Sequence, residues 1–309
     1  LGSGSVIHAM EHVERGLQEE GKDVHFDTQD MRFMGGLKEY MPSTYKTFLL
    51  ATIAIAGIPP LAGFFSKDEV LMMAFSGGFG DYAGPLYMVL WLVGMVTAFL
   101  TAFYMFRLIF GTFHGPFKLP SPVNGAEGAE QYLHESPKTM TIPLWTLGGL
   151  SVVGGFIGIP NFLLATFTHQ EEHINLLHTW LQGIVVDFDL VLSHSTEWIL
   201  MILSILIAVA GLWAAYRMYG SGATEASDAT LVGKFGSLYQ IWKEKYSFDE
   251  FYEGVIVNPL VRFSERGLAV FDMKIVDGLV NAVAGIVRLT GSLLRYTQTG
   301  IASNYALFL

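Results

Sequence analysis

The chain has 309 residues, 51% of them hydrophobic and 15% charged, and the apolar residues form long blocks that are typical of a membrane protein. Its 28 acidic and 18 basic residues give a formal net charge of −10, which argues against nucleic-acid binding because that function needs a basic surface. The sequence contains no cysteine, which excludes a disulfide or a cysteine-bound iron–sulfur cluster in this chain.

The first predicted element is the end of a membrane helix, from Leu1 to about Met10, with small residues that allow close packing. His8 and His12 are spaced by four residues, so they share one face of a helix and could bind a metal ion or relay protons. The alternative is that they mark the exit of the helix from the membrane. The polar residues that follow favour a loop from Glu14 to Asp30.

A broken membrane helix is predicted next. The apolar segment at residues 44–75 is too long for one straight span, and Pro59 and Pro60 interrupt it. Adjacent prolines cannot continue a helix, because each lacks an N–H group and its ring clashes with the preceding turn. We therefore expect a first half-helix from about Ser43 to Ala56 and a second one from Ser66 to about Phe75.

Ionisable residues stand at the predicted restart of this helix. Ser66 and Glu69 fit a capping box, in which the serine is the N-cap and the glutamate reaches back to it. Lys67 and Asp68 lie between them, and membrane transporters build ion sites from broken helices that carry such groups. A cation is costly at the positive end of a helix, so Lys67 is a candidate proton carrier. The alternative is a lysine whose side chain extends to the membrane interface.

Three more apolar spans are predicted at Pro85–Arg107, Met140–Ala165 and Thr196–Arg217. The loop between the last two contains His169, His173, His178 and His194. A metal site is conceivable there, but the spacing matches no compact ligand pattern, which favours a solvated loop. Loops with Lys and Arg alternate with loops that have none, so the basic loops are expected on the cytoplasmic side and Lys67 on the outward half of its path.

The pattern becomes periodic at about Phe248–Gln298. Apolar residues recur every three or four positions and charged residues fall opposite them, which predicts a long amphipathic helix on the membrane surface or along partner subunits. Pro259 is expected to kink or restart this helix. Asp272 falls within the apolar stripe, so we expect it to have a polar partner, unless it lies near a kink and contacts water.

Two ordered motifs resemble a known family. They are Gln29–Leu37 (QDMRFMGGL) and Gly63–Glu69 (GFFSKDE), joined by hydrophobic spans of compatible number. Both closely resemble the largest antiporter-like membrane subunit of bacterial NADH:quinone oxidoreductase, respiratory complex I, of the subunit L or chain 5 type. The segments Tyr246–Tyr252 and Val257–Pro259 are similar to that family's entry into a lateral helix. The related subunits of multi-subunit sodium/proton antiporters are the alternative.

The resemblance implies an all-α, polytopic membrane helical bundle with a discontinuous transmembrane helix and a long amphipathic lateral helix. It also implies a proton-translocating subunit of NADH:quinone oxidoreductase, in which Lys67 belongs to the proton path, Asp68 adjusts its charge, and His8 is a relay candidate. No cofactor is expected in this chain; NADH, FMN, iron–sulfur clusters and quinone are expected in partner subunits. A third, structural interpretation makes the lateral helix a clamp and Lys67 an anchor.

The expected location is the bacterial plasma (inner) membrane, with the lateral helix on the cytoplasmic side. The expected partners are other membrane subunits of complex I, especially the neighbouring antiporter-like subunits that the lateral helix would contact. We expect a helix bundle at residues 1–219, truncated at its N-terminus, a connecting segment and lateral helix at 220–299, and the start of a final, truncated helix at 300–309. The sequence is thus expected to be the C-terminal half of a longer protein, since it opens on Leu1 and ends in apolar residues.

Overall fold

A computed structural model describes residues 1–22, 24–79, 84–119, 128–160, 192–222 and 232–297, together with residues 163, 176–181, 184, 229, 300, 302 and 306. The regular elements of this part of the chain are all helices, which confirms the all-α prediction. The chain divides into two compact units, Leu1–Thr230 and Leu231–Leu309, and each unit is described by itself.

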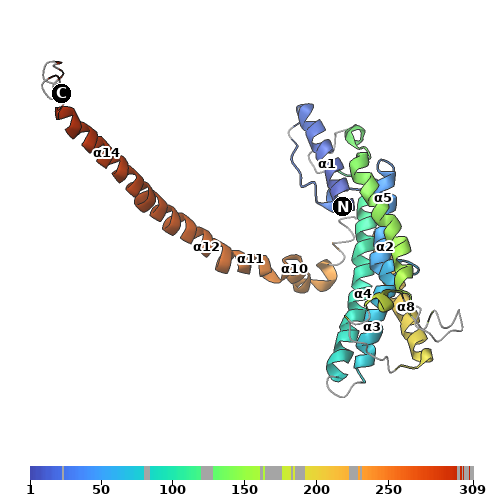
Figure 1. Cartoon of the computed structure of the whole chain (residues 1–309). Coiled ribbons are helices and arrows are strands. Elements are labelled where there is room, and N and C mark those ends of the chain that lie inside the picture. Colours follow the sequence, from blue (N-terminus) through green and yellow to red (C-terminus); the bar gives the residue numbers. More distant parts are fainter. Residues whose placement is uncertain are drawn as a thin grey trace. The chain divides into compact units, whose positions relative to one another are not determined.

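The first unit is a helix bundle (Figure 1). Its longer helices are α1 (Gly2–Glu19), α2 (Pro42–Ala56), α3 (Ala62–Gly77), α4 (Gly84–Phe113), α5 (Lys138–Val153) and α8 (His194–Tyr219). Shorter elements are η1 (Met31–Phe33), η2 (Ala129–Tyr132), η3 (Gly154–Gly158) and α7 (Leu176–Leu181).

Three helical segments among the described residues are long and apolar enough to cross a membrane. They are α4, the continuous α5–η3 segment at Lys138–Gly158, and α8, and they coincide with the three spans predicted after the broken helix. The predicted end of the second span at Ala165 lies outside the described residues. Apolar side chains on the outer face of α4, such as Leu86, Val89 and Leu90, are exposed, as expected of a surface that meets lipid.

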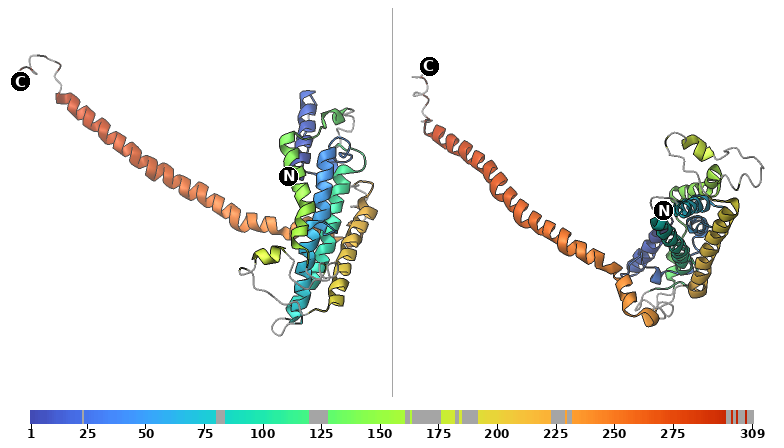
Figure 2. Two further views of the ribbon diagram at one scale, coloured as in Figure 1. Left: turned by 45° about the vertical axis from the view of Figure 1, so that its right-hand side comes forward. Right: turned by 90° about the horizontal axis from the view of Figure 1, so that it is seen from below.

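Helix α4 holds the bundle together. It packs against α2, α3 and α8, and the ribbons of α4 and α8 run side by side in both views of Figure 2. One apolar core joins α1, α2, α4 and α8 and contains the fully buried Met10, Leu17 and Phe113. A second core lies between α3 and α8, with Phe64, Met72 and Met201 among its members, where Met201 is 7% exposed. Both half-helices of the predicted break are thus fixed on neighbouring spans.

The first helix is longer than predicted. The sequence pattern favoured a loop from Glu14 onward, but α1 continues to Glu19. The loop prediction was wrong because the apolar stripe of Val6, Met10, Val13 and Leu17 continues past the last hydrophobic block and is buried against the core. His12 is accordingly a helical residue and does not open a loop.

The second unit is dominated by one long helix, drawn as the orange and red ribbon of Figure 1. After α10 (Ser237–Lys243) and η4 (Lys245–Ser247), abutting elements run without interruption from Phe248 to Thr297. These are α11 (Phe248–Tyr252), η5 (Glu253–Val257), α12 (Asn258–Phe263), η6 (Ser264–Leu268), α13 (Ala269–Phe271), η7 (Asp272–Val276) and α14 (Asp277–Thr297).

Three of these elements, η5, η6 and η7, are π-helical turns. Pro259 lies in the first turn of α12, directly after η5, so the helix changes its hydrogen-bonding register just before the proline. Asp272 is the first residue of η7 and is exposed. The long helix itself is confirmed, whereas a polar partner for Asp272 stays a prediction.

Candidate functional site

The predicted break lies between α2 and α3. Helix α2 ends at Ala56, and Gly57 follows in the left-handed conformation with a φ of 77°. Pro59 and Pro60 lie in the link, and the peptide bond between them is cis. Since neither proline can extend the first half-helix, the chain turns here and starts again from Leu61, the N-cap of α3.

The second half-helix starts earlier than predicted. It begins at Ala62, so Ser66 lies in its second turn and not at its N-cap. The Ser66 hydroxyl donates to the carbonyl oxygens of Ala62 and Gly63, at 3.4 and 3.5 Å. The predicted capping box of Ser66 and Glu69 is therefore wrong. Leu61 is extended, which ends the link and starts a helix without a capping side chain.

Lys67 connects the two half-helices. Its Nζ donates to the Ile55 carbonyl oxygen at 2.8 Å, and that carbonyl lies in the last turn of α2, where no helical N–H is left to bond it. The C-terminal end of a helix carries a partial negative charge, which favours a cation there. The sequence argument placed the ammonium at the positive start of α3, whereas the structure places it at the negative end of α2.

Two glycines make this arrangement possible. A Cβ atom at Gly57 would lie 3.1 Å from Cδ of Lys67, so the glycine leaves room for the lysine stem. A Cβ atom at Gly63 would lie 1.9 Å from the Ala54 carbonyl oxygen, which no side chain could tolerate. The start of α3 therefore lies directly against the backbone of α2, and this contact places Lys67 within reach of Ile55.

Asp68 is buried beside Lys67, with 2% of its surface exposed. Its Oδ1 accepts a hydrogen bond from Ser204 Oγ of α8 at 2.7 Å. Its Oδ2 is also buried and accepts no hydrogen bond within the described part of the chain. Sequence reasoning missed Ser204, because a single serine in an apolar span usually bonds to its own helix.

A cavity of about 10 Å³ lies between these groups, which is close to the space that one water molecule needs. It is enclosed by the end of α2, the start of α3, and the middle of α4 and α8. The lining residues are Ala56, Gly57, Phe64, Lys67, Asp68, Ala98, Ser204 and Ala208. Lys67, Asp68 and Ser204 are its polar members, so the cavity joins the ammonium, the carboxylate and the hydroxyl in one site.

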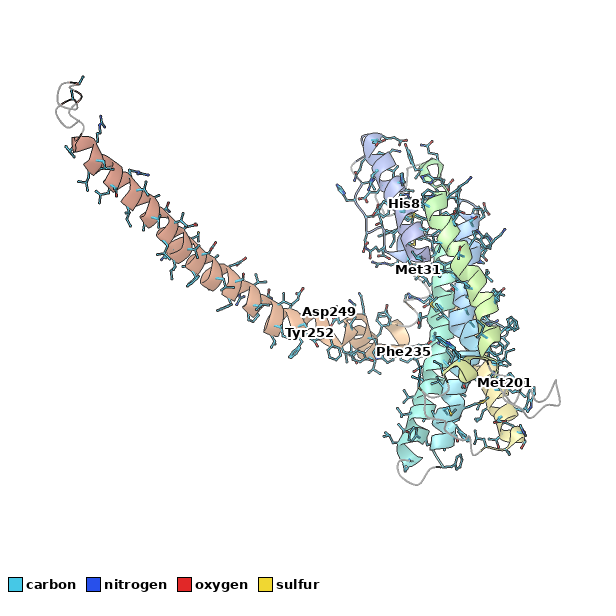
Figure 3. The ribbon with its side chains drawn as sticks, viewed as in Figure 1. His8, Met31, Met201, Phe235, Asp249 and Tyr252 are labelled. Carbon is cyan, nitrogen blue, oxygen red and sulfur yellow. The ribbon has the colours of Figure 1, made fainter. Side chains whose placement is uncertain are left out.

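A second group of titratable side chains lies on α1. The ring centroids of His8 and His12 are 4.6 Å apart, as their spacing predicted, and Figure 3 labels His8 on this helix. His134, from the segment after η2, completes the cluster with its ring centroid 4.9 Å from that of His12. Sequence reasoning missed His134 because it is more than a hundred positions away in the chain.

The described residues contain no group of three side chains placed to hold a metal ion. Of the loop histidines, His169 and His173 lie outside the described residues, and His178 belongs to α7. His194 starts α8, with its Nδ1 3.2 Å from Glu197 Oε2.

A glutamate outside α2 caps the first half-helix. Glu135 Oε2 accepts hydrogen bonds from the backbone N–H groups of Ser43 and Thr44, at 2.6 and 3.3 Å, and Oε1 accepts from the Thr44 hydroxyl at 2.6 Å. Thr44 Oγ1 also lies 2.8 Å from Ser5 Oγ of α1. The start of the broken helix is therefore fixed by a buried polar network, which no local motif had indicated.

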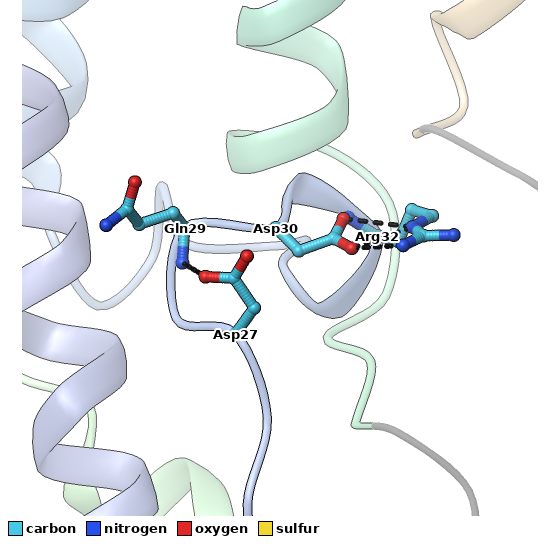
Figure 4. A network of polar contacts seen from close by, with 4 residues as sticks. All are labelled: Asp27, Gln29, Asp30 and Arg32. Carbon is cyan, nitrogen blue, oxygen red and sulfur yellow. Dashed lines mark hydrogen bonds and ion pairs between the residues drawn. The ribbon is translucent and has the colours of Figure 1, made fainter. Parts of the chain in front are cut away.

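The first sequence motif forms a tight loop (Figure 4). Asp30 caps η1 by accepting from the Arg32 backbone N–H at 2.9 Å, and its Oδ2 accepts from Arg32 Nε at 2.8 Å. These bonds to Arg32 hold the pKa of Asp30 below its ordinary value. Gly36 N–H donates to the His114 carbonyl oxygen at 3.2 Å, so the loop is joined to the end of α4.

Two family models match the chain. One is described as NADH:quinone oxidoreductase/Mrp antiporter, TM, and matches residues 1–101, which include α2, the break and α3. The other is described as the C-terminus, with its transmembrane helices, of an NADH-dehydrogenase (complex I) component, and matches residues 120–258. The second description names complex I alone, which favours that assignment over a sodium/proton antiporter.

Known proteins similar to the chain carry consistent names. NAD(P)H-quinone oxidoreductase chain 5 of a Picosynechococcus species is 39% identical over 99% of this chain and 44% of its own length. NAD(P)H-quinone oxidoreductase subunit 5, chloroplastic, of Chlorokybus atmophyticus is 33% identical over 99% of this chain and 42% of its own length. NADH-quinone oxidoreductase subunit L of Mycobacterium tuberculosis is 36% identical over 99% and 41%. The chain thus spans less than half the length of these relatives.

Proposed function

The chain belongs to the antiporter-like membrane subunits of NADH:quinone oxidoreductase, and we propose that it takes part in proton translocation with Lys67 as the proton carrier. The observation that carries the proposal is the 2.8 Å bond from Lys67 Nζ to the Ile55 carbonyl oxygen, across the break in a membrane helix. A lysine can alternate between ammonium and amine, and an ionisable group at a broken helix is the usual form of a transporter ion site.

The neighbouring groups give the lysine a suitable environment. The negative end of α2 and the Asp68 carboxylate both favour the ammonium form, while the apolar core around Phe64 penalises any net charge. These opposing effects allow a small change nearby to shift the proton balance of Lys67, and Asp68 is the residue that adjusts it. His8, with His12 and His134, is a further relay candidate on α1.

The redox reaction is assigned to other subunits. The chain has no cysteine to ligate an iron–sulfur cluster, so NADH, FMN, clusters and quinone would be bound by partner subunits. The long helix at Phe248–Thr297 would run along neighbouring antiporter-like subunits on the cytoplasmic side of the plasma membrane, because the loops on that side carry the Lys and Arg residues.

The test uses the full-length protein, assembled in its complex in membrane vesicles. NADH oxidation, quinone reduction and proton uptake are followed in parallel for Lys67→Ala and for a control, Lys46→Ala, which removes an exposed lysine from the start of α2. We expect Lys67→Ala to abolish proton uptake with the complex intact, and Lys46→Ala to leave it unchanged. Normal uptake in Lys67→Ala would refute the role of the lysine. Sodium-driven proton exchange without NADH-driven uptake would support an antiporter subunit instead.

A further inference from the structure

Ser204 on α8 faces two acceptors at once. Its Oγ lies 2.7 Å from Asp68 Oδ1 and 2.9 Å from the carbonyl oxygen of Met201, one turn earlier on the same helix and labelled in Figure 3. A serine hydroxyl has one hydrogen to donate and two lone pairs to accept with. It can therefore satisfy only one of these acceptors at a time, and the choice between them depends on the state of the carboxyl group.

Both protonation states of Asp68 fit the same positions of the heavy atoms. When the carboxylate is ionised, Ser204 donates its hydrogen to Oδ1. When a proton from the cavity binds to Oδ1, the new O–H group donates to Ser204 Oγ, and the serine hydrogen turns to the Met201 carbonyl oxygen. The charge of the carboxyl changes from −1 to 0, and each arrangement keeps one hydrogen bond between the two side chains.

The surroundings of Asp68 require such a partner. With 2% of its surface exposed, the carboxyl has almost no water to bond in either state, and Oδ2 accepts no hydrogen bond from the described residues. A buried charge without partners is strongly destabilising, and a buried neutral acid also needs an acceptor for its hydrogen. Along with the small cavity that Asp68 shares with Lys67, the hydroxyl of Ser204 is what α8 contributes to this site.

We propose that Ser204 is a positioning residue that holds the Asp68 carboxyl in both its protonated and its ionised state, so that Asp68 binds and releases a proton beside Lys67. The proposal rests on the proposed function and deepens it, because it adds a second proton-binding group and a helix, α8, to the site of the broken helix. Neither sequence motif includes Ser204, which is 136 positions from Asp68.

The experiment combines proton uptake with infrared difference spectroscopy on the full-length protein in its complex. The C=O band of protonated Asp68 is identified by its loss in Asp68→Asn. In Ser204→Ala we expect this band to move to higher frequency, because the acid loses its hydrogen-bond partner, and proton uptake to fall about tenfold, which is ~1.4 kcal/mol for one charge-assisted hydrogen bond. Ser204→Thr, which keeps the hydroxyl, should restore both.

Ser151→Ala is the matched control, because Ser151 Oγ donates to the Gly148 carbonyl oxygen at 2.7 Å in the same way that Ser204 bonds Met201. It should change neither the band nor the uptake. The proposal is overturned if Ser204→Ala behaves like Ser151→Ala, or if no acid band disappears in Asp68→Asn. Its failure is distinct from that of the proposed function: Lys67→Ala tests the lysine through uptake alone, whereas the Asp68 band is observed whether or not Lys67 carries protons.

Discussion

The contact between the two half-helices gives the sharpest prediction, through Gly63→Ala. The added Cβ would lie 1.9 Å from the Ala54 carbonyl oxygen, whereas real Cβ atoms essentially never come closer than 3.0 Å. The backbones of α2 and α3 would have to separate by at least the difference, 3.0 − 1.9 = 1.1 Å. Overpacking of this kind costs about 1–3 kcal/mol, and the obstacle here is backbone, which cannot rotate away.

The displacement should also affect function, because it moves Lys67 relative to the Ile55 carbonyl oxygen. We expect Gly63→Ala to lower the thermal midpoint of the assembled complex and to reduce proton uptake at unchanged NADH binding. Gly149→Ala is the control, since a Cβ at Gly149 meets no atom within 4 Å and alanine is the better helix former. If both variants pump protons at the parent rate, the close contact between the half-helices does not position Lys67, and the reasoning fails.

Two further predictions concern groups that hold the loops around the broken helix. Glu135→Ala should cost about 1 kcal/mol of stability, because the N–H groups of Ser43 and its neighbour lose their cap, and calorimetry against the exposed control Glu39→Ala would measure it. Arg32→Gln should raise the pKa of Asp30 toward its ordinary value of 3.8, because the bonds to Arg32 lower it in the folded protein. A lowered pKa stabilises the fold above that value and loses its effect as the pH falls, so the parent and Arg32→Gln should differ in thermal midpoint near neutral pH and converge in acid; a constant difference would contradict this.

The broken helix illustrates how far local sequence reaches. Two adjacent prolines forbid a continuous helix whatever surrounds them, so the break and the first half-helix, α2, followed from residues 59 and 60 alone. The restart did not, because a helix start depends on which backbone groups find partners. The capping-box pattern at Ser66 satisfied the local rule, yet Leu61 and the contact of Gly63 with Ala54 fixed the start of α3 four residues earlier.

The sequence by itself determined the membrane spans, the break, the long amphipathic helix and the importance of Lys67, because these depend on hydropathy, on proline stereochemistry and on periodicity within one segment. Only the tertiary structure decided the partners of the ionisable groups: Ser204 for Asp68, the end of α2 for Lys67, and His134 for the histidines of α1. Those contacts join residues from separate helices, and a chain of apolar spans can pack its helices in many orders. The position of a single serine or histidine gains a meaning only when one packing places it against a buried charge or another titratable ring.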